Sequence, residues 1–144
     1  MKRVLFLCSS NRYRSRFAEH LFNWLAARHG LQHRAASRGL LVGRQWHDGP
    51  LSTRAVAGLQ QRGIPINARC PRQVSESDLA QADLIVAVKE DEHRHTIASM
   101  FPRWVDRVEY WHVDDSDNTK PEEALHRLEN EVRMLLARLN ADGV

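Results

Sequence analysis

The sequence predicts an α/β fold in which a four-stranded parallel sheet of order 2-1-3-4 forms the middle of three layers, with helices on both faces. Short apolar segments alternate along the chain with longer segments of helical periodicity, and such alternation indicates right-handed crossovers between parallel strands. The 144 residues are enough for one sizeable core. The chain shows no repeat and no linker, so we expect a single domain over residues 1–144.

The N-terminal half is expected to contribute two strands and two helices. Residues 2–7 are mostly apolar, as in a buried parallel strand. The helix after the next loop should end near Gly30. Its apolar residues share one face, and they are Phe17, Ala18, Leu21, Phe22 and Leu25. Residues 32–37 should form the second strand. A loop over residues 40–50, interrupted by glycine and proline, then leads to a helix over about residues 51–61.

The C-terminal half continues the alternation. Ser75 begins a segment with the pattern of a helix start. Residues 82–88 pass from a helix end into a third buried strand, and a helix is expected over about residues 91–100. Residues 107–112 should form the fourth strand. After an acidic loop, the last helix carries a stripe of leucine and valine side chains, so it should pack on the sheet.

The predicted strand order also predicts where a ligand would bind. In a sheet of order 2-1-3-4, as in flavodoxin-like folds, the topological switch point lies beside the first strand at its carboxyl end. Cys8 stands at that end, and the acidic loop after the fourth strand reaches the same edge. We therefore expect one crevice between these two segments.

Composition gives weaker information about partners. The formal net charge is +3, and no motif indicates a nucleic-acid partner. No apolar run approaches the roughly 20 residues of a membrane span, and the N-terminal run is too short for a signal peptide. Two cysteines, Cys8 and Cys70, do not make a disulfide scaffold. We expect a cytoplasmic protein without a membrane partner, and the sequence leaves the oligomeric state open.

The segment between the first strand and its helix has the features of an oxyanion-binding loop. It reads Cys8-Ser9-Ser10-Asn11-Arg12-Tyr13-Arg14-Ser15. Backbone N–H groups at a helix N-terminus attract anions, and a guanidinium can hold two oxygens of a phosphate. The same positive field favours a thiolate at Cys8. A thiolate beside a bound phosphate indicates nucleophilic phosphoryl transfer, and the alternative is a structural thiol followed by a solvated Arg14.

The pattern Cys-x5-Arg-Ser after an N-terminal strand resembles the low-molecular-weight protein tyrosine phosphatases and the related thioredoxin-coupled arsenate reductases. Residues 82–88 resemble a further block of that family. The resemblance implies a phosphotyrosine phosphatase I-like fold and a cysteine-dependent phosphomonoesterase, most simply a protein tyrosine phosphatase with a Cys-phosphate intermediate. It implies no metal or other cofactor. The partner would be a phosphorylated protein or a small phosphomonoester, and phosphate-like oxyanions would bind.

The resemblance also assigns roles within the loop. Asn11 matches an asparagine that holds the loop in a left-handed backbone conformation, which asparagine tolerates well. Ser15 matches a serine whose hydroxyl bonds the thiolate, although from the residues alone it could simply help to cap the helix. We also expect Ser37 to bond the loop through Asn11.

The acid that protonates the leaving group should come from the acidic loop after the fourth strand. The family places this acid in an Asp-Pro pair, and Asp115 aligns best with it, with Ser116 in place of the proline. Asp117 and Asp114 are the alternatives. A solvated acidic turn without a catalytic role is the other interpretation of the three carboxylates.

Trp46 is the remaining candidate for the substrate cleft. An indole in a loop bounded by glycines is either a core plug or a cleft wall, and the resemblance favours a wall beside the substrate ring. Three positions in or beside the thiol loop also depart from the family pattern: Ser10 replaces a usual glycine, Tyr13 a frequent second cysteine, and Arg16 a usual proline. No aromatic residue follows the acid, so phosphotyrosine specificity is less secure than phosphatase chemistry.

Two other functions are compatible with the same loop. An arsenate reductase would use it for arsenate, but the thioredoxin-coupled type needs two further cysteines and only Cys70 remains. A small-thiol-coupled reductase would need Cys8 alone. A phospho-ligand binding module with weak catalysis is the third reading, motivated by the replacements at Ser10 and Ser116.

Three further polar side chains are expected on solvated faces. Arg16 adds to the positive charge near the loop, and we interpret it as a solvated helix residue. His93 and His95 diverge by about 200° on one helix, so they cannot bind one metal ion together and are interpreted in the same way.

Overall fold

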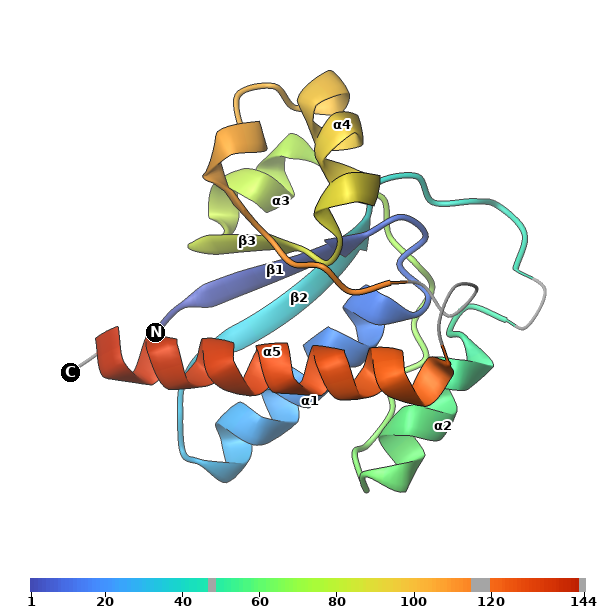
Figure 1. The fold of residues 1–144 in the computed structure, drawn as a ribbon, viewed down its shortest axis with the longest axis vertical. Helices are drawn as coiled ribbons and strands as arrows, with labels where there is room; N and C mark the ends of the chain where they lie inside the picture. Colours follow the sequence, from blue (N-terminus) through green and yellow to red (C-terminus); the bar gives the residue numbers. More distant parts are fainter. Residues whose placement is uncertain (47–48, 115–119, 143–144) are drawn as a thin grey trace.

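The computed structural model describes residues 1–46, 49–114 and 120–142. Within these ranges four strands form one parallel sheet of order β2-β1-β3-β4, so the predicted fold class and strand order are confirmed. The strands are β1 (Arg3–Cys8), β2 (Arg34–Gly39), β3 (Leu84–Ala87) and β4 (Val108–Tyr110). In Figure 1 the carboxyl ends of the strands lie on the right.

Helices cover both faces of the sheet, as predicted. Figure 1 shows α1, α2 and α5 on the lower face and α3 and α4 on the upper face. The helices are α1 (Arg14–Arg28), α2 (Thr53–Gln61), α3 (Glu76–Gln81), α4 (Glu90–Met100) and α5 (Pro121–Asp142), with a short 3-10 helix, η1 (Val105–Arg107).

Local capping explains where the structure refines the predicted boundaries. The Ser52 hydroxyl accepts from the Arg54 N–H at 3.2 Å, so α2 begins two residues later than expected. The predicted helix start at Ser75 is confirmed by a reciprocal capping box with Asp78, with bonds of 2.9 and 3.2 Å. The fourth strand begins one residue later than expected because η1 already occupies Arg107, and it ends at Tyr110.

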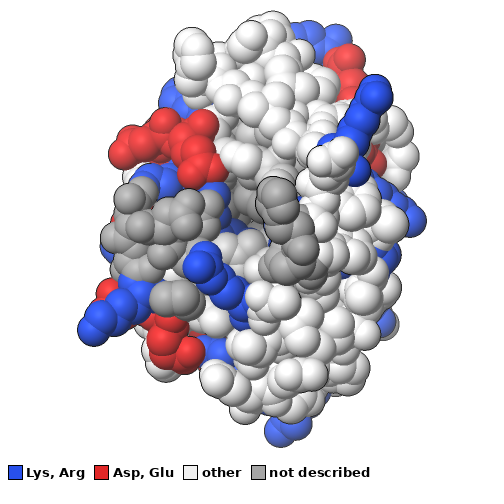
Figure 2. Space-filling view, turned by 90° about the vertical axis from the view of Figure 1, so that its right-hand side faces the viewer, with Lys and Arg blue, Asp and Glu red and all other residues white. Residues whose placement is uncertain are grey.

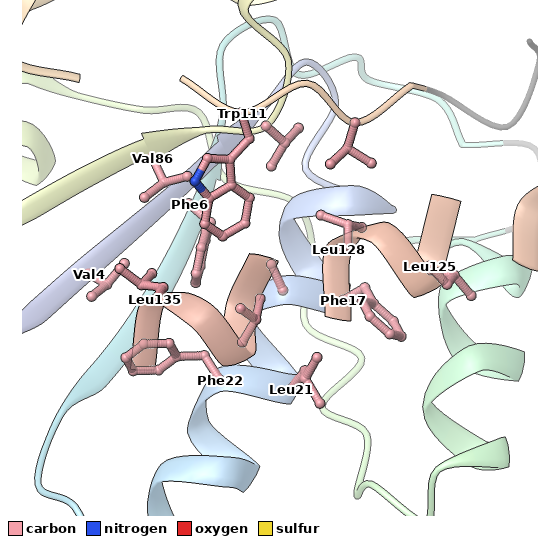
Figure 3. Packing of buried hydrophobic residues seen from close by; sticks show 14 of the residues in the cluster. Val4, Phe6, Phe17, Leu21, Phe22, Val86, Trp111, Leu125, Leu128 and Leu135 are labelled. Carbon is pink, nitrogen blue, oxygen red and sulfur yellow. The ribbon is translucent and has the colours of Figure 1, made fainter. Parts of the chain in front are cut away.

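The larger apolar cluster lies between the sheet and helices α1 and α5. Figure 3 shows Phe6 of β1 at its centre, in edge contact with Phe22 and tilted against Trp111 at centroid distances of 6.0 and 5.6 Å. Burying an aromatic side chain of this size contributes roughly 1.5–3 kcal/mol. A smaller cluster that includes Leu7 and Ile97 covers the other face. Strand β1 is therefore fixed from both sides, and the loop after it starts from a rigid base.

The carboxyl end of β1 is packed closely against the loop after β2. Cys8 is the register partner of Gly39, and the Leu40 N–H donates to the Cys8 carbonyl at 2.9 Å. A Cβ on Gly39 would lie 2.9 Å from the Ser9 carbonyl oxygen and 2.6 Å from the Val42 side chain. Only glycine leaves room for this approach, so Gly39 is needed for the loop after Cys8 to pass here.

The chain after β4 follows the end of β3 towards the same edge. The Trp111 N–H donates to the Ala87 carbonyl, and the Val113 N–H donates to the Val88 carbonyl, both at 2.9 Å. Residues Val113 and Asp114 are thereby brought beside the start of α4 and the loop after β1. The predicted convergence of the loop after Cys8 with the segment after the fourth strand is confirmed up to Asp114.

Candidate active site

The loop after β1 is built around a buried thiol. Cys8 is 2% exposed, and its Sγ lies 2.9 Å from the Ser15 Oγ. The Ser15 Oγ also accepts a bond of 2.9 Å from the Asn11 amide nitrogen. Because the Asn11 amide nitrogen can only donate, the Ser15 oxygen is the acceptor in that bond. The Ser15 hydroxyl hydrogen is then free to point at the Cys8 sulfur. A hydroxyl donor aimed at Sγ stabilises a thiolate.

Asn11 organises the loop as the resemblance implied. It is completely buried, and its backbone φ is 59°, in the left-handed region. Its amide nitrogen also donates to the Ser37 Oγ at 2.9 Å, which confirms the expected contact with Ser37. Its side-chain oxygen accepts from the Arg72 N–H at 3.0 Å. Contacts at both the amide nitrogen and the amide oxygen of Asn11 hold its backbone in the left-handed conformation, which is otherwise unfavourable for a residue other than glycine.

Arg14 stands at the first residue of α1 with its guanidinium fixed on both sides. It is 3% exposed, so the prediction is right that it is not a solvated helix residue. One terminal nitrogen donates to the Val113 carbonyl at 2.9 Å, and the other donates to Glu92 at 2.8 Å. Helix α1 has no side-chain cap and no acidic residue in its first turn. Its positive end and an oriented guanidinium thus face the thiol loop together.

The other loop residues line the same turn. Ser9 and Ser10 are partly exposed, and Tyr13 is buried. The Arg12 side chain donates to the Gly49 carbonyl at 3.1 Å. Seen from the carboxyl edge of the sheet, basic and acidic side chains lie close together on this face of the molecule (Figure 2).

Glu92 is a site residue that the sequence analysis missed. One of its oxygens accepts from the Ser9 hydroxyl at 2.7 Å and from Arg14 at 2.8 Å, and lies 2.8 Å from the His93 Nε2. The bond with His93, followed by those with Arg14 and Ser9, holds the pKa of Glu92 far below its ordinary value, although burial opposes this. A carboxylate therefore stays ionised beside the anion loop.

The expectation that His93 lies on a solvated face is wrong. It is 1% exposed, and its Nδ1 accepts from the Lys89 N–H at 3.2 Å, which leaves the hydrogen on Nε2 for Glu92. His93 lies four residues before the buried Ile97, so both side chains share the inner face of α4. This spacing was the available signal. His95 is exposed, as expected. Across the described residues, no three His, Cys, Asp or Glu side chains are grouped to bind a metal ion.

Of the acidic loop, the structure describes only Asp114. Its carboxylate pairs with the Lys89 ammonium, and this bond holds the pKa of Asp114 below its ordinary value. A carboxylate that is kept ionised is poorly suited to donate a proton. Asp115, Ser116 and Asp117 lie outside the described residues.

Trp46 lies on the loop after β2 and is partly exposed, so it is not a core plug. Its indole N–H donates to the Gly43 carbonyl at 3.1 Å. The same loop is joined to the thiol loop, because the Leu41 N–H donates to the Ser9 carbonyl at 2.9 Å. Leu41 itself is 63% exposed beside the site, and the sequence analysis did not single it out.

The expectation that Arg16 lies on a solvated face is also wrong. Its side chain is fully buried, and its guanidinium donates to four backbone carbonyls from three separate segments of the chain. A buried guanidinium is stable only when such acceptors surround it.

A buried thiol with a hydroxyl donor, beside a fixed guanidinium at a helix N-terminus, defines a cysteine-dependent phosphoryl-transfer site. Residues 3–144 match the model of the family described as low molecular weight phosphotyrosine protein phosphatase. The chain belongs to this family. The predicted recognition, the predicted hydrolase and its cysteine-dependent phosphomonoesterase class are thereby confirmed.

Similar proteins agree with this assignment. A protein-arginine-phosphatase of Bacillus subtilis is 32% identical over 105 residues, which are 73% of this chain and 67% of that protein. The low molecular weight protein-tyrosine-phosphatase YfkJ of the same organism is 38% identical over 86 residues, which are 59% of this chain and 54% of that protein.

Solved structures extend the likeness over almost the whole chain. The YfkJ structure from Bacillus subtilis has a TM-score of 0.85 at 29% identity and covers 99% of this chain and 96% of its own. A mutant of the arginine phosphatase YwlE with a phosphorylated active-site serine has a TM-score of 0.83 at 26% identity, with 97% of each chain covered.

Proposed function

We propose that Cys8 is the nucleophile of a phosphatase that acts on phosphorylated protein side chains, phosphotyrosine first among them. The contact of the Ser15 hydroxyl with the Cys8 sulfur carries this proposal, since it supports a thiolate next to a fixed Arg14. Residues 9–15 would hold the phosphate through backbone N–H groups, and Arg14 would hold two of its oxygens.

The reaction has two displacements at phosphorus. The Cys8 thiolate forms an S–P bond as the bond to the leaving oxygen breaks, and an acid gives its proton to that oxygen. A water then attacks the phosphocysteine and passes a proton to the same carboxylate, while the S–P bond breaks and releases inorganic phosphate. We assign the acid to Asp115, with Asp117 as the alternative. The Lys89 partner of Asp114 makes that residue the weakest candidate.

The substrate proposal rests on two features. Trp46 and the exposed Leu41 lie on the loop joined to the thiol loop, and we propose Trp46 as a wall for an aromatic ring. Phosphoarginine is a second candidate, because the chain is 32% identical to a protein-arginine-phosphatase. Hydrolysis of a phosphotyrosine peptide and of a phosphoarginine peptide of the same sequence separates the two.

The other two functions have less support. Cys8 is buried, Cys70 is exposed, and both thiols are free, so the described residues offer no partner pair for a disulfide relay. An arsenate reductase would consume a small thiol in an arsenate-dependent way. A binding module would hold phosphate without turnover, and the contact of the Ser15 hydroxyl with the Cys8 sulfur supports a reactive thiol over binding alone.

The main test is steady-state hydrolysis of p-nitrophenyl phosphate. Cys8→Ser should abolish turnover, and Asp115→Asn should lower kcat by about 10²–10⁴-fold, the usual contribution of general acid catalysis. Asp117→Asn is the matched control. Full activity in Cys8→Ser would refute the proposal, and a large loss in Asp117→Asn alone would move the acid to Asp117.

We further propose that residues 1–144 act as one domain in the cytoplasm on a phosphorylated protein, without nucleic-acid or membrane partners. Along the described parts of the chain, no helix is both long enough and apolar enough to cross a bilayer. Oligomeric state is best measured directly by sedimentation.

A further inference from the structure

Arg16 is a buried cation directly behind the thiol loop. Its side chain is 0% exposed, and one terminal nitrogen donates to the Asn11 carbonyl at 3.1 Å and to the Pro50 carbonyl at 3.4 Å. The other donates to the Asn67 and Arg69 carbonyls at 3.0 and 2.8 Å. All four acceptors are neutral. Within the described part of the chain no carboxylate forms an ion pair with Arg16, so its charge is solvated but not cancelled.

A second guanidinium reaches the same loop residue. Arg69 donates to the Asn11 side-chain oxygen at 3.2 Å, to Glu19 at 3.0 Å and to the Ser37 Oγ at 3.1 Å. Glu19 also accepts from the Ser37 hydroxyl at 2.5 Å. Two guanidiniums and one carboxylate therefore lie behind Asn11, with one positive charge in excess.

The charge on Arg16 persists at neutral pH despite its surroundings. Burial and the neighbouring Arg69 lower the pKa of Arg16 from 12.5 to about 10, whereas Glu19, Cys8 and Cys70 oppose this. The Nε of Arg16 is buried without a hydrogen-bond partner among the described residues. An arrangement that only stabilised the fold would avoid an orphan donor and an uncancelled buried charge. The uncancelled charge of Arg16 interacts favourably with negative charge at Cys8.

We propose that Arg16, assisted by Arg69, is a positioning residue that holds Asn11 in its left-handed conformation and supplies positive charge to the Cys8 thiolate and the bound phosphate. Arg16 acts through the Asn11 carbonyl and the field, and it touches no substrate atom. This inference rests on the proposed role of Cys8. It assigns a function to the arginine that stands where the family usually has proline.

The test compares Arg16→Met, Arg16→Lys and the control Arg28→Met, which removes an exposed arginine from the same helix. All carry Cys70→Ser, so that iodoacetamide reports on Cys8 alone. We expect Arg16→Met to move the midpoint of the alkylation pH profile upward by about one unit and to weaken inhibition by inorganic phosphate about tenfold, the effect of losing a nearby charge. Arg16→Lys should recover most of the shift, and Arg28→Met should show none.

Two results would overturn the inference. A folded Arg16→Met with an unchanged alkylation profile and unchanged phosphate inhibition would show that its charge has no role. Equal loss of kcat in Arg16→Met and Arg16→Lys, without a pH shift in either, would show a purely structural role. If Arg16→Met does not fold, Arg69→Gln replaces it, because Arg69 is partly exposed and should give a smaller shift of the same sign.

The outcome is separable from the proposed phosphatase activity. Alkylation of Cys8 and protection by inorganic phosphate need no turnover, so they report on the thiol loop even if no ester is hydrolysed. If no form of the protein hydrolysed an ester but Arg16→Met still shifted the alkylation profile as expected, the proposed function would be contradicted and the role of Arg16 would stand.

Discussion

The hydroxyl of Ser15 should account for a large part of the reactivity of Cys8. Ser15→Ala removes the only side-chain donor that the described residues place on the sulfur, at an Sγ–Oγ distance of 2.9 Å. It also takes one of two acceptors from the Asn11 amide nitrogen, which keeps Ser37. Ser15 is fully buried, so water has little access to replace the lost hydroxyl.

The magnitude follows from the type of bond. A hydrogen bond to a charged group contributes about 1.5–3 kcal/mol. Ser15→Ala should therefore lower the rate of Cys8 alkylation by iodoacetamide at constant pH by about 10–100-fold.

The assay is alkylation of Cys8 between pH 4 and 9 in a Cys70→Ser background, combined with kcat for p-nitrophenyl phosphate. The matched control is Ser77→Ala, which removes an exposed helical hydroxyl. Ser77→Ala should behave like the parent. A Ser15→Ala protein that is folded and has the parent alkylation profile and kcat would refute the view that this hydroxyl stabilises a thiolate.

Three other changes test separate features of the site. Gly39→Ala would force a Cβ to within 2.9 Å of the Ser9 carbonyl oxygen. We expect a loss of about 1–3 kcal/mol in the free energy of unfolding, measured by urea denaturation, and a raised KM in steady-state kinetics. An unchanged free energy of unfolding would contradict this. The depressed pKa of Glu92 means that its stabilising effect is present above its ordinary pKa of 4.5 and is lost as the pH falls below that value. In Glu92→Gln the free energy of unfolding, measured by urea unfolding, should therefore fall less steeply at acid pH than in the parent. The same acid dependence in both proteins would show that Glu92 ionisation does not contribute to stability. Asp114→Asn should change kcat less than threefold because Lys89 already holds that carboxylate ionised, and a loss as large as that of Asp115→Asn would be inconsistent with this assignment.

The thiol loop could be predicted because its chemistry is local in the sequence. Cys8, Arg14 and Ser15 lie within eight consecutive positions, and a strand followed by a helix determines how such a segment must turn. The parallel sheet with helices on both faces followed from alternation and handedness, which depend little on individual side chains, and the strand order followed from the likeness to flavodoxin-like folds. The roles of Asn11 and Ser15 came from the family resemblance, and the structure shows the contact of Asn11 with the Ser15 hydroxyl and of Ser15 with the Cys8 sulfur.

The residues around the loop could not be predicted in the same way. Glu92 meets Arg14 only because β3 pairs with β1, which brings the start of α4 beside residues 78 positions earlier in the chain. The burial of Arg16 depends on carbonyls of Asn67 and Arg69, whose position is fixed by tertiary structure. For Arg16 the sequence pattern contains no information on these distant acceptors, so a solvated position is the default expectation for a charged side chain on a helix.

The most direct test of the account is detection of a phosphoryl group on Cys8. Protein mixed with p-nitrophenyl phosphate and denatured within milliseconds should carry one phosphoryl group on the peptide that contains Cys8, together with a burst of about one equivalent of nitrophenolate. Asp115→Asn should accumulate more of this species, since its breakdown also needs the carboxylate. Steady turnover without a phosphorylated Cys8 peptide, or turnover retained in Cys8→Ser, would contradict the central claim.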